Sequence, residues 1–96
     1  MSLELLLFAA IQRGASADVE SIVGTDKVNI NARDAGGWTP LMRAAAGGHL
    51  DIMRFLLSNG ADPTLRDKRG ITALSLASPQ AKAVLVEFLR NDARMP

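Results

Sequence analysis

Residues 37–62, which read GWTPLMRAAAGGHLDIMRFLLSNGAD, decide the fold. Thr39-Pro40 predicts the start of a helix, because threonine caps a first turn with its side chain and proline there has no N–H to leave without a partner. Gly47-Gly48 should end that helix. A second helix is predicted over 50–58, where apolar residues recur at helical spacing, and Asn59-Gly60 should end it in a left-handed conformation. The stretch therefore predicts two short helices.

The same pattern recurs 33 residues later. The matched pairs are Arg33/Arg66, Asp34/Asp67, Gly37/Gly70, Thr39/Thr72, Leu41/Leu74, Ala44/Ala77, Phe55/Phe88 and Leu56/Leu89. Upstream, Val19 and Ile22 match Ile52 and Phe55, and one extra residue after Gly14 places Ala10 under Ala44. Because glycines fall on glycines and apolar residues on apolar residues, the match does not follow from composition alone. No unit this short can bury its apolar stripe alone, so the three units must stack.

The third unit varies the pattern. A helix is predicted from about Thr72 to Ala77, and Ser78-Pro79 should cap and start a second helix that reaches about Asn91. In the second helices of the three units, we expect two core layers, Val19/Ile52/Leu85 and Ile22/Phe55/Phe88.

The middle unit resembles the ankyrin repeat nearly from end to end. The residues that carry the resemblance are Gly37-Trp38-Thr39-Pro40-Leu41, Ala44-Ala45, Gly48-His49, Phe55-Leu56-Leu57 and Gly60-Ala61-Asp62. Met42 and Ser75 stand at the family's usual histidine position, and Ala73 replaces its proline. Without that histidine, a polar tie between turn and helix should be lost.

The resemblance covers about residues 4 to 92 and implies an all-α solenoid. Three helix–turn–helix units should be joined by β-hairpin-like turns: an N-terminal capping repeat at 1–34, a full repeat at 35–67 and a C-terminal capping repeat at 68–96. It also implies that the chain binds another protein through its turn tips and concave face, as an adaptor, regulator or inhibitor.

The predicted partner-binding residues are of two kinds. Large or apolar side chains near the turn and on the inner helices are Trp38, Met42, Arg43, Ile71 and Leu76, and basic turn residues are Arg33, Arg66, Lys68 and Arg69. Tryptophan and arginine are frequent at binding hot spots. The alternatives are that Trp38 packs on the neighbouring turn, that the tail after Arg90 covers Leu76, and that the turn charges are merely solvated.

The opening helix suggests a second role. It is apolar nearly all round, whereas a terminal unit should turn a polar face to water. The chain is therefore either part of a longer array or associates with itself through Leu3, Leu6 and Phe8. The plainer alternative is that these leucines are only partly exposed.

Composition and motifs argue against other functions. With no cysteine and one histidine, His49, neither a metal site nor a nucleophilic site is expected, so we predict no enzyme, cofactor or small-molecule substrate. The formal net charge of +1 and the lack of aromatic residues among the basic ones make nucleic acid an unfavoured partner. No apolar run is long enough for a membrane span. The absence of cysteine is compatible with an intracellular compartment, cytoplasmic or nuclear.

Overall fold

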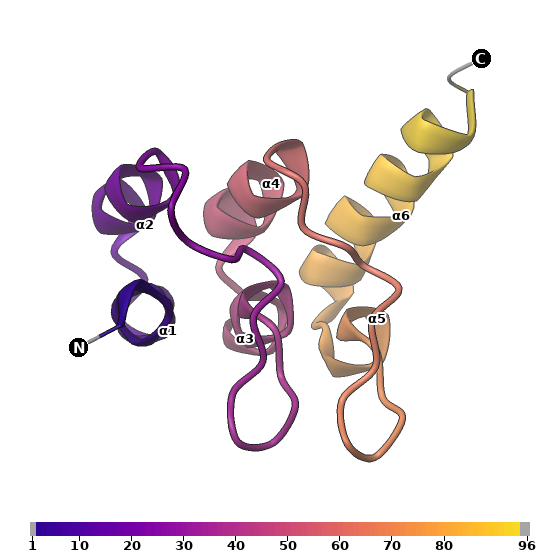
Figure 1. The fold of residues 1–96 in the computed structure, drawn as a ribbon. Coiled ribbons are helices and arrows are strands. Elements are labelled where there is room, and N and C mark those ends of the chain that lie inside the picture. Colours follow the sequence, from indigo (N-terminus) through magenta and orange to yellow (C-terminus); the bar gives the residue numbers. More distant parts are fainter. Residues whose placement is uncertain (1, 95–96) are drawn as a thin grey trace.

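The computed structural model describes residues 2–94, and within them the chain forms six helices and no regular strand. The helices are α1 (Leu3–Gln12), α2 (Ser16–Val23), α3 (Pro40–Gly47), α4 (Leu50–Ser58), α5 (Ala73–Leu76) and α6 (Pro79–Arg94). They form three antiparallel pairs that stand side by side, with α1, α3 and α5 in one layer and α2, α4 and α6 in the other (Figure 1). The predicted all-α stack is confirmed, whereas the boundaries of the three units stay a prediction.

The ends of α3 follow from the residues that the sequence places there. The Thr39 hydroxyl accepts a hydrogen bond from the Met42 N–H at 3.2 Å, and Pro40 occupies the first helical position. Gly48 ends the helix with φ 70°, a left-handed conformation that costs glycine little. The second helix, α4, has the predicted bounds.

In the third unit, both helices differ in length from the prediction. The first, α5, spans four residues, and the chain returns to an extended conformation at Ala77. The side chain of Thr72 makes no capping hydrogen bond, and Ala73 replaces the proline that starts α3. The second, α6, starts at Ser78-Pro79 as predicted, with the Ser78 hydroxyl accepting from the Ala81 N–H at 3.3 Å, but it continues to Arg94.

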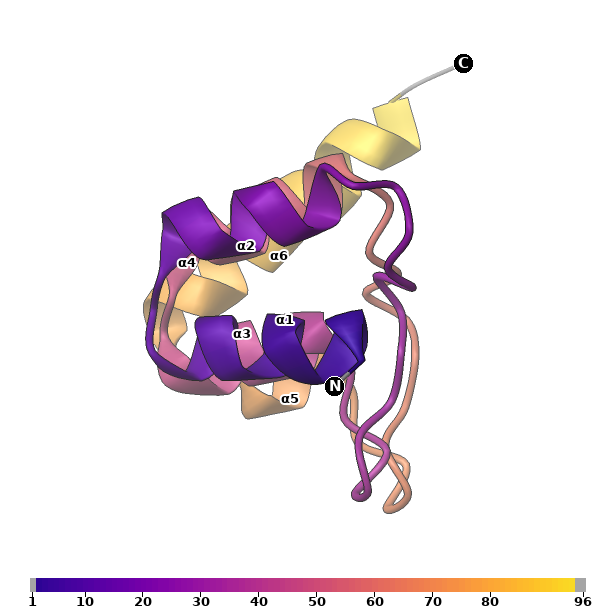
Figure 2. The ribbon, with the colours of Figure 1, turned by 60° about the vertical axis from the view of Figure 1, so that its left-hand side comes forward.

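The two turns before α3 and α5 are built alike. The Asp34 N–H donates to the Trp38 carbonyl at 2.9 Å, and the Asp67 N–H donates to the Ile71 carbonyl at 2.8 Å. Arg66 and Thr72 form an isolated antiparallel bridge. Both turns extend beyond the layer of first helices, so that turns and helices make an L in cross-section (Figure 2). The predicted hairpin-like turns are confirmed.

The core lies between the two helix layers. Val19, Ile52 and Leu85 are at most 2% exposed, so the first predicted core layer is confirmed. The second, Ile22/Phe55/Phe88, is only half-buried. Each of these residues follows a first-layer residue by three positions, about 60° short of a full turn, which places it at the flank of the buried stripe.

Candidate partner-binding surface

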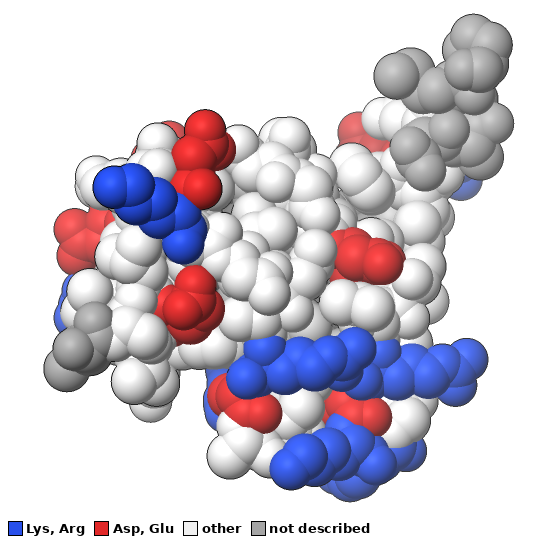
Figure 3. Space-filling view, viewed as in Figure 1, with Lys and Arg blue, Asp and Glu red and all other residues white. Residues whose placement is uncertain are grey.

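The turns and the first helices of the second and third units form one continuous face. Lys and Arg side chains gather over the two turns on this side of the molecule (Figure 3). The basic residues Arg33, Arg43, Arg66, Lys68 and Arg69 are exposed, whereas Trp38, Ile71 and Leu76 are half-buried. The structure therefore places eight of the nine predicted partner-binding residues on its surface.

Met42 is the exception, and its prediction as a partner-binding residue is wrong. Its side chain is 1% exposed, because α3 is enclosed by α1 on one side and α5 on the other. The Met42 sulfur accepts a weak hydrogen bond from the Thr39 N–H at 3.5 Å. Met42 thus supplies part of the tie between turn and helix that was expected to be lost with the family's histidine.

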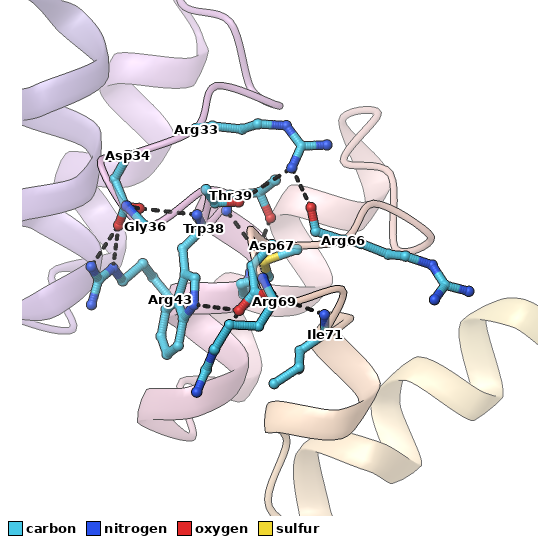
Figure 4. Close-up of polar contacts among 12 residues, drawn as sticks. Arg33, Asp34, Gly36, Trp38, Thr39, Arg43, Arg66, Asp67, Arg69 and Ile71 are labelled. Atoms are coloured by element: carbon cyan, nitrogen blue, oxygen red, sulfur yellow. Dashed lines mark hydrogen bonds and ion pairs between the residues drawn. The ribbon is translucent and has the colours of Figure 1, made fainter.

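Trp38 connects the two turns. Its indole N–H donates to the Asp67 carboxylate of the next turn at 3.0 Å, and the Arg43 guanidinium lies 4.6 Å from the centre of its rings (Figure 4). A cation over an aromatic face is attracted by the ring's electron density. The alternative that Trp38 packs on the neighbouring turn therefore holds, and the exposed part of its ring adjoins Arg43.

Asp34 and Asp67 hold equivalent places in the two turns. One carboxylate oxygen of Asp34 accepts from the N–H groups of Gly36 and Trp38, both at 2.9 Å, and the other accepts from Arg43 at 2.5 and 3.0 Å. Burial alone would raise the pKa of Asp34, but these hydrogen bonds outweigh it and lower the pKa below its usual value. Asp34 therefore stays ionised and orients Arg43 across the face.

Asp67 lacks an arginine from its own first helix. Its Oδ1 accepts from the N–H groups of Ile71 and Arg69 at 2.9 and 2.8 Å, and its Oδ2 accepts from Trp38. These bonds, that from Ile71 first, lower the pKa of Asp67 against the opposing effect of burial. In the third unit, Leu76 replaces Arg43, and Oδ2 of Asp67 is contacted instead by the Trp38 indole and, at 3.5 Å, by the Arg69 guanidinium. That replacement is the sequence signal from which this contact could have been found.

Of the four basic turn residues, one joins the two turns and three stay at a single turn. Arg33 Nη1 donates to the Gly37 carbonyl at 3.3 Å and also to the Arg66 carbonyl of the next turn. Arg66, Lys68 and Arg69 have exposed side chains, although Arg66 Nη1 donates to the Gly70 carbonyl at 3.5 Å and the Arg69 guanidinium lies 3.5 Å from Asp67. Arg33 thus stabilises the pair of turns, and the other three give the face its positive charge.

Leu76 remains accessible as far as the structure describes the chain. The tail after Arg90 continues as helix α6 to Arg94, at the end of the molecule away from α5 (Figure 1). The described part of the tail therefore does not cover Leu76, and the remainder lies outside the described residues.

His49 fits the structural role expected for it. Its imidazole packs against two glycines: a Cβ built on Gly14 would lie 3.1 Å from the ring, and one built on Gly47 would lie 2.7 Å from it. Among residues whose positions are described, no three His, Asp or Glu side chains are grouped to hold a metal ion. None of the described helices is long and apolar enough to cross a membrane.

Of the three residues predicted for self-association, only Leu6 is exposed, at 41%, whereas Leu3 and Phe8 are half-buried. Leu5, which was not predicted, is 61% exposed. At the other end of the stack, Leu74, Val86 and Leu89 are between 39% and 46% exposed. Apolar side chains therefore reach the surface at both ends.

Comparison with known proteins supports the architecture. A family model described as ankyrin repeats in many copies matches residues 25–77. The chain is 32% identical over 90 residues to alpha-latrocrustotoxin-Lt1a of Latrodectus tredecimguttatus, covering 90% of this chain and 6% of that protein. It is 38% identical over 74 residues to the 2-5A-dependent ribonuclease of Mus musculus, covering 77% and 10%, respectively. Ankyrin repeat family A protein 2 of Homo sapiens is 56% identical over 48 residues, covering 50% and 15%.

The chain thus spans at most 15% of the length of these three relatives. Ankyrin repeats are in general modules for protein–protein interaction. The family match covers more than half of the chain and includes both turns, α3, α4 and α5. This chain belongs to the ankyrin repeat family.

Proposed function

We propose that this chain binds an acidic segment of another protein along the face formed by the two turns, α3 and α5. The observation that carries the proposal is that three exposed basic residues, Arg66, Lys68 and Arg69, lie in the turn that Trp38 contacts, while Arg43 stacks on Trp38. Lys and Arg side chains gather over the turns in Figure 3, and Figure 4 shows Arg66 and Arg69 beside this pair. The basic residues would attract the partner, and the aromatic and apolar residues would provide area to bury.

The rigidity of the two turns favours this function. The Lys68 N–H donates to the Gly36 carbonyl at 3.3 Å, and Trp38 and Arg33 add two further links between the turns. A surface that is already ordered loses little conformational entropy when it binds, so modest contacts yield useful affinity. The half-buried Ile71 and Leu76 extend the same face with apolar area.

The arrangement is less suited to nucleic acid. Recognition of single strands needs aromatic faces on which bases stack. Trp38 is the chain's one tryptophan, no tyrosine is present, and the indole face is shared with Arg43. An acidic peptide needs no such platform.

Trp38 provides the assay. We expect a synthetic peptide of ten glutamates to change the fluorescence of this single tryptophan, with an affinity that falls as salt is added. The Lys68→Glu/Arg69→Glu double variant should bind at least tenfold more weakly. Lys27→Glu/Arg54→Glu, the same double charge reversal at exposed residues outside the two turns, is the matched control and should change affinity less than twofold.

An equal loss in both variants would contradict the proposed surface. Tighter binding of an oligonucleotide than of the peptide, with affinity retained after Trp38→Ala, would favour nucleic acid instead. To find the natural partner, proteins captured from a lysate by the wild-type chain but not by the Lys68→Glu/Arg69→Glu variant should be identified by mass spectrometry.

A further inference from the structure

The last unit exposes the apolar positions that the middle unit buries. Leu74, Val86 and Leu89, here called the C-terminal face, are 39%, 46% and 39% exposed. Their equivalents 33 residues earlier, Leu41, Met53 and Leu56, are at most 1% exposed.

The cause of the difference is the neighbouring unit. In the middle unit, α5 packs on α3 and α6 packs on α4, and these contacts cover the equivalent positions. The C-terminal face therefore repeats a surface whose occupant within this chain is known: the pair of helices of a following unit.

The first unit exposes the complementary side. A groove between α1 and α2, here called the N-terminal face, is lined by Leu6, Ala9, Ala10, Arg13, Asp18, Ser21 and Ile22. Because of the extra residue after Gly14, the equivalent of Leu6 in the middle unit is Pro40. Leu6 is 41% exposed, whereas Pro40, whose helix has α1 beside it, is less than 2% exposed. The first unit thus presents a side that, in the middle unit, is covered by a preceding unit.

The charges at the two ends are opposite in sign. Outside the two turns, residues 1–32 carry four acidic and two basic side chains, a formal charge of −2, whereas residues 71–96 carry three basic and two acidic ones, a charge of +1. On α6, the exposed Lys82 and Arg90 lie one turn before and one turn after Val86, on the same side of the helix. Asp18 lies on the N-terminal face, where it forms an exposed ion pair with Arg13 at 2.9 Å.

From the repeat equivalence and this polarity, we infer that a second copy of the chain stacks head to tail on the first. The N-terminal face of one copy packs on the C-terminal face of the other, which continues the stack across the junction. Leu6 and Ile22 then meet Leu74, Val86 and Leu89, and Asp18 meets the basic residues beside Val86. The proposed partner-binding face on the turns takes no part and remains accessible.

Two unlike faces make a contact that does not close on itself. Such a heterologous contact produces a series of growing oligomers rather than a single dimer. Light scattering after size-exclusion chromatography should therefore show an average mass that rises steadily with protein concentration. The mass should fall at high salt, because exposed charge pairs are screened.

Variants at the two faces test the polarity of the contact. Leu6→Lys places a positive charge at the centre of the N-terminal face, which would then meet the basic residues beside Val86. Val86→Glu places a negative charge at the centre of the C-terminal face, which would then meet Asp18. Each variant alone should be monomeric, with association weakened at least tenfold. An equimolar mixture should give a dimer, because each variant retains the intact face that the other needs.

Leu5→Lys is the matched control. It makes the same exchange at the neighbouring residue, which is 61% exposed and does not line the groove, so the mass series should persist. Circular dichroism of each variant checks that it is folded. Monomers of the wild-type chain at all concentrations would overturn the inference and leave both faces to units of another chain. Failure of the mixture to form dimers, or continued association of Val86→Glu alone, would also overturn it.

Discussion

Replacing Trp38 by phenylalanine should weaken the contact between the second and third units. The change removes the indole N–H that donates to Asp67 at 3.0 Å but keeps an aromatic ring beside Arg43. A hydrogen bond to a charged group contributes about 1.5–3 kcal/mol to stability. We therefore expect the free energy of unfolding to fall by about 2 kcal/mol, measured by urea denaturation with circular dichroism. In a domain of this size, each kcal/mol corresponds to roughly 4–8 °C in Tm.

A double-mutant cycle with Asp67→Asn separates this bond from the loss of ring area. In the asparagine variant, the side-chain oxygen can still accept from the Arg69 and Ile71 N–H groups, but an NH₂ group can face the indole donor. Trp38→Phe should then cost less, with a coupling energy of at least about 1 kcal/mol. Asp62→Asn is the control, because its oxygen can still accept both hydrogen bonds from Thr64. Coupling below about 0.5 kcal/mol would refute the role given to this contact.

The same carboxylate should make stability depend on pH in a defined direction. The pKa of Asp67 is lowered in the folded state, chiefly by the backbone N–H of Ile71, so the folded chain binds fewer protons than the unfolded chain as the group titrates. Its contribution is fully present above the unfolded pKa of about 3.9 and is lost as the pH falls through the folded value. Urea denaturation between pH 6 and 3 should therefore show falling stability, and the fall should be smaller in Asp67→Asn.

Two further comparisons test the packing. Gly70→Ala should lower the free energy of unfolding by about 1–2 kcal/mol through its φ of 80° alone. Gly37→Ala should lower it by about 1–3 kcal/mol more, because a Cβ there would lie 2.9 Å from the backbone nitrogen of Lys68. Equal losses in urea denaturation would show that the two turns do not approach closely. Leu56→Ala should lower the free energy of unfolding by about 2–5 kcal/mol through the cavity it leaves. Because Phe55 is only half-buried, Phe55→Ala should lower it by about 1–2 kcal/mol. A larger loss for Phe55 by the same measurement would contradict the burial described.

Helix ends are predictable from the sequence where a single residue type decides them. Thr39 and Pro40 start α3, Gly48 ends it, and the bounds of α4 follow from its apolar spacing and the glycine after it. α5 begins directly after Thr72, as α3 does after Thr39, but it ends at Leu76 because the chain becomes extended at Ala77, just before Ser78-Pro79. Local signals therefore give the fold and place the ends of these helices to within a few residues.

The site is less predictable, because burial depends on neighbouring units. Met42 stands next to the exposed Arg43, yet helices on both sides of α3 enclose it. Likewise, Arg33 and Arg66 each donate to the carbonyl of their own turn's glycine, Gly37 or Gly70, but only Arg33 also reaches the carbonyl of a following turn. The position of a residue within the repeat predicts its place in the fold but not its contacts.

The face proposed for partner binding is also part of the contact between units. Trp38 follows the turn before α3 and Asp67 lies in the turn before α5, so the bond between them joins the two turns. A partner that contacts both turns would bind only when the two units are stacked. By mass action it would therefore stabilise the stack, by about 2.7 kcal/mol at a hundred times its Kd. Substitution of Trp38 then weakens binding in two ways, through lost contact area and through a less stable pair of turns. For that reason, Lys68 reports binding more cleanly than the tryptophan does, whereas Arg69 also contacts Asp67.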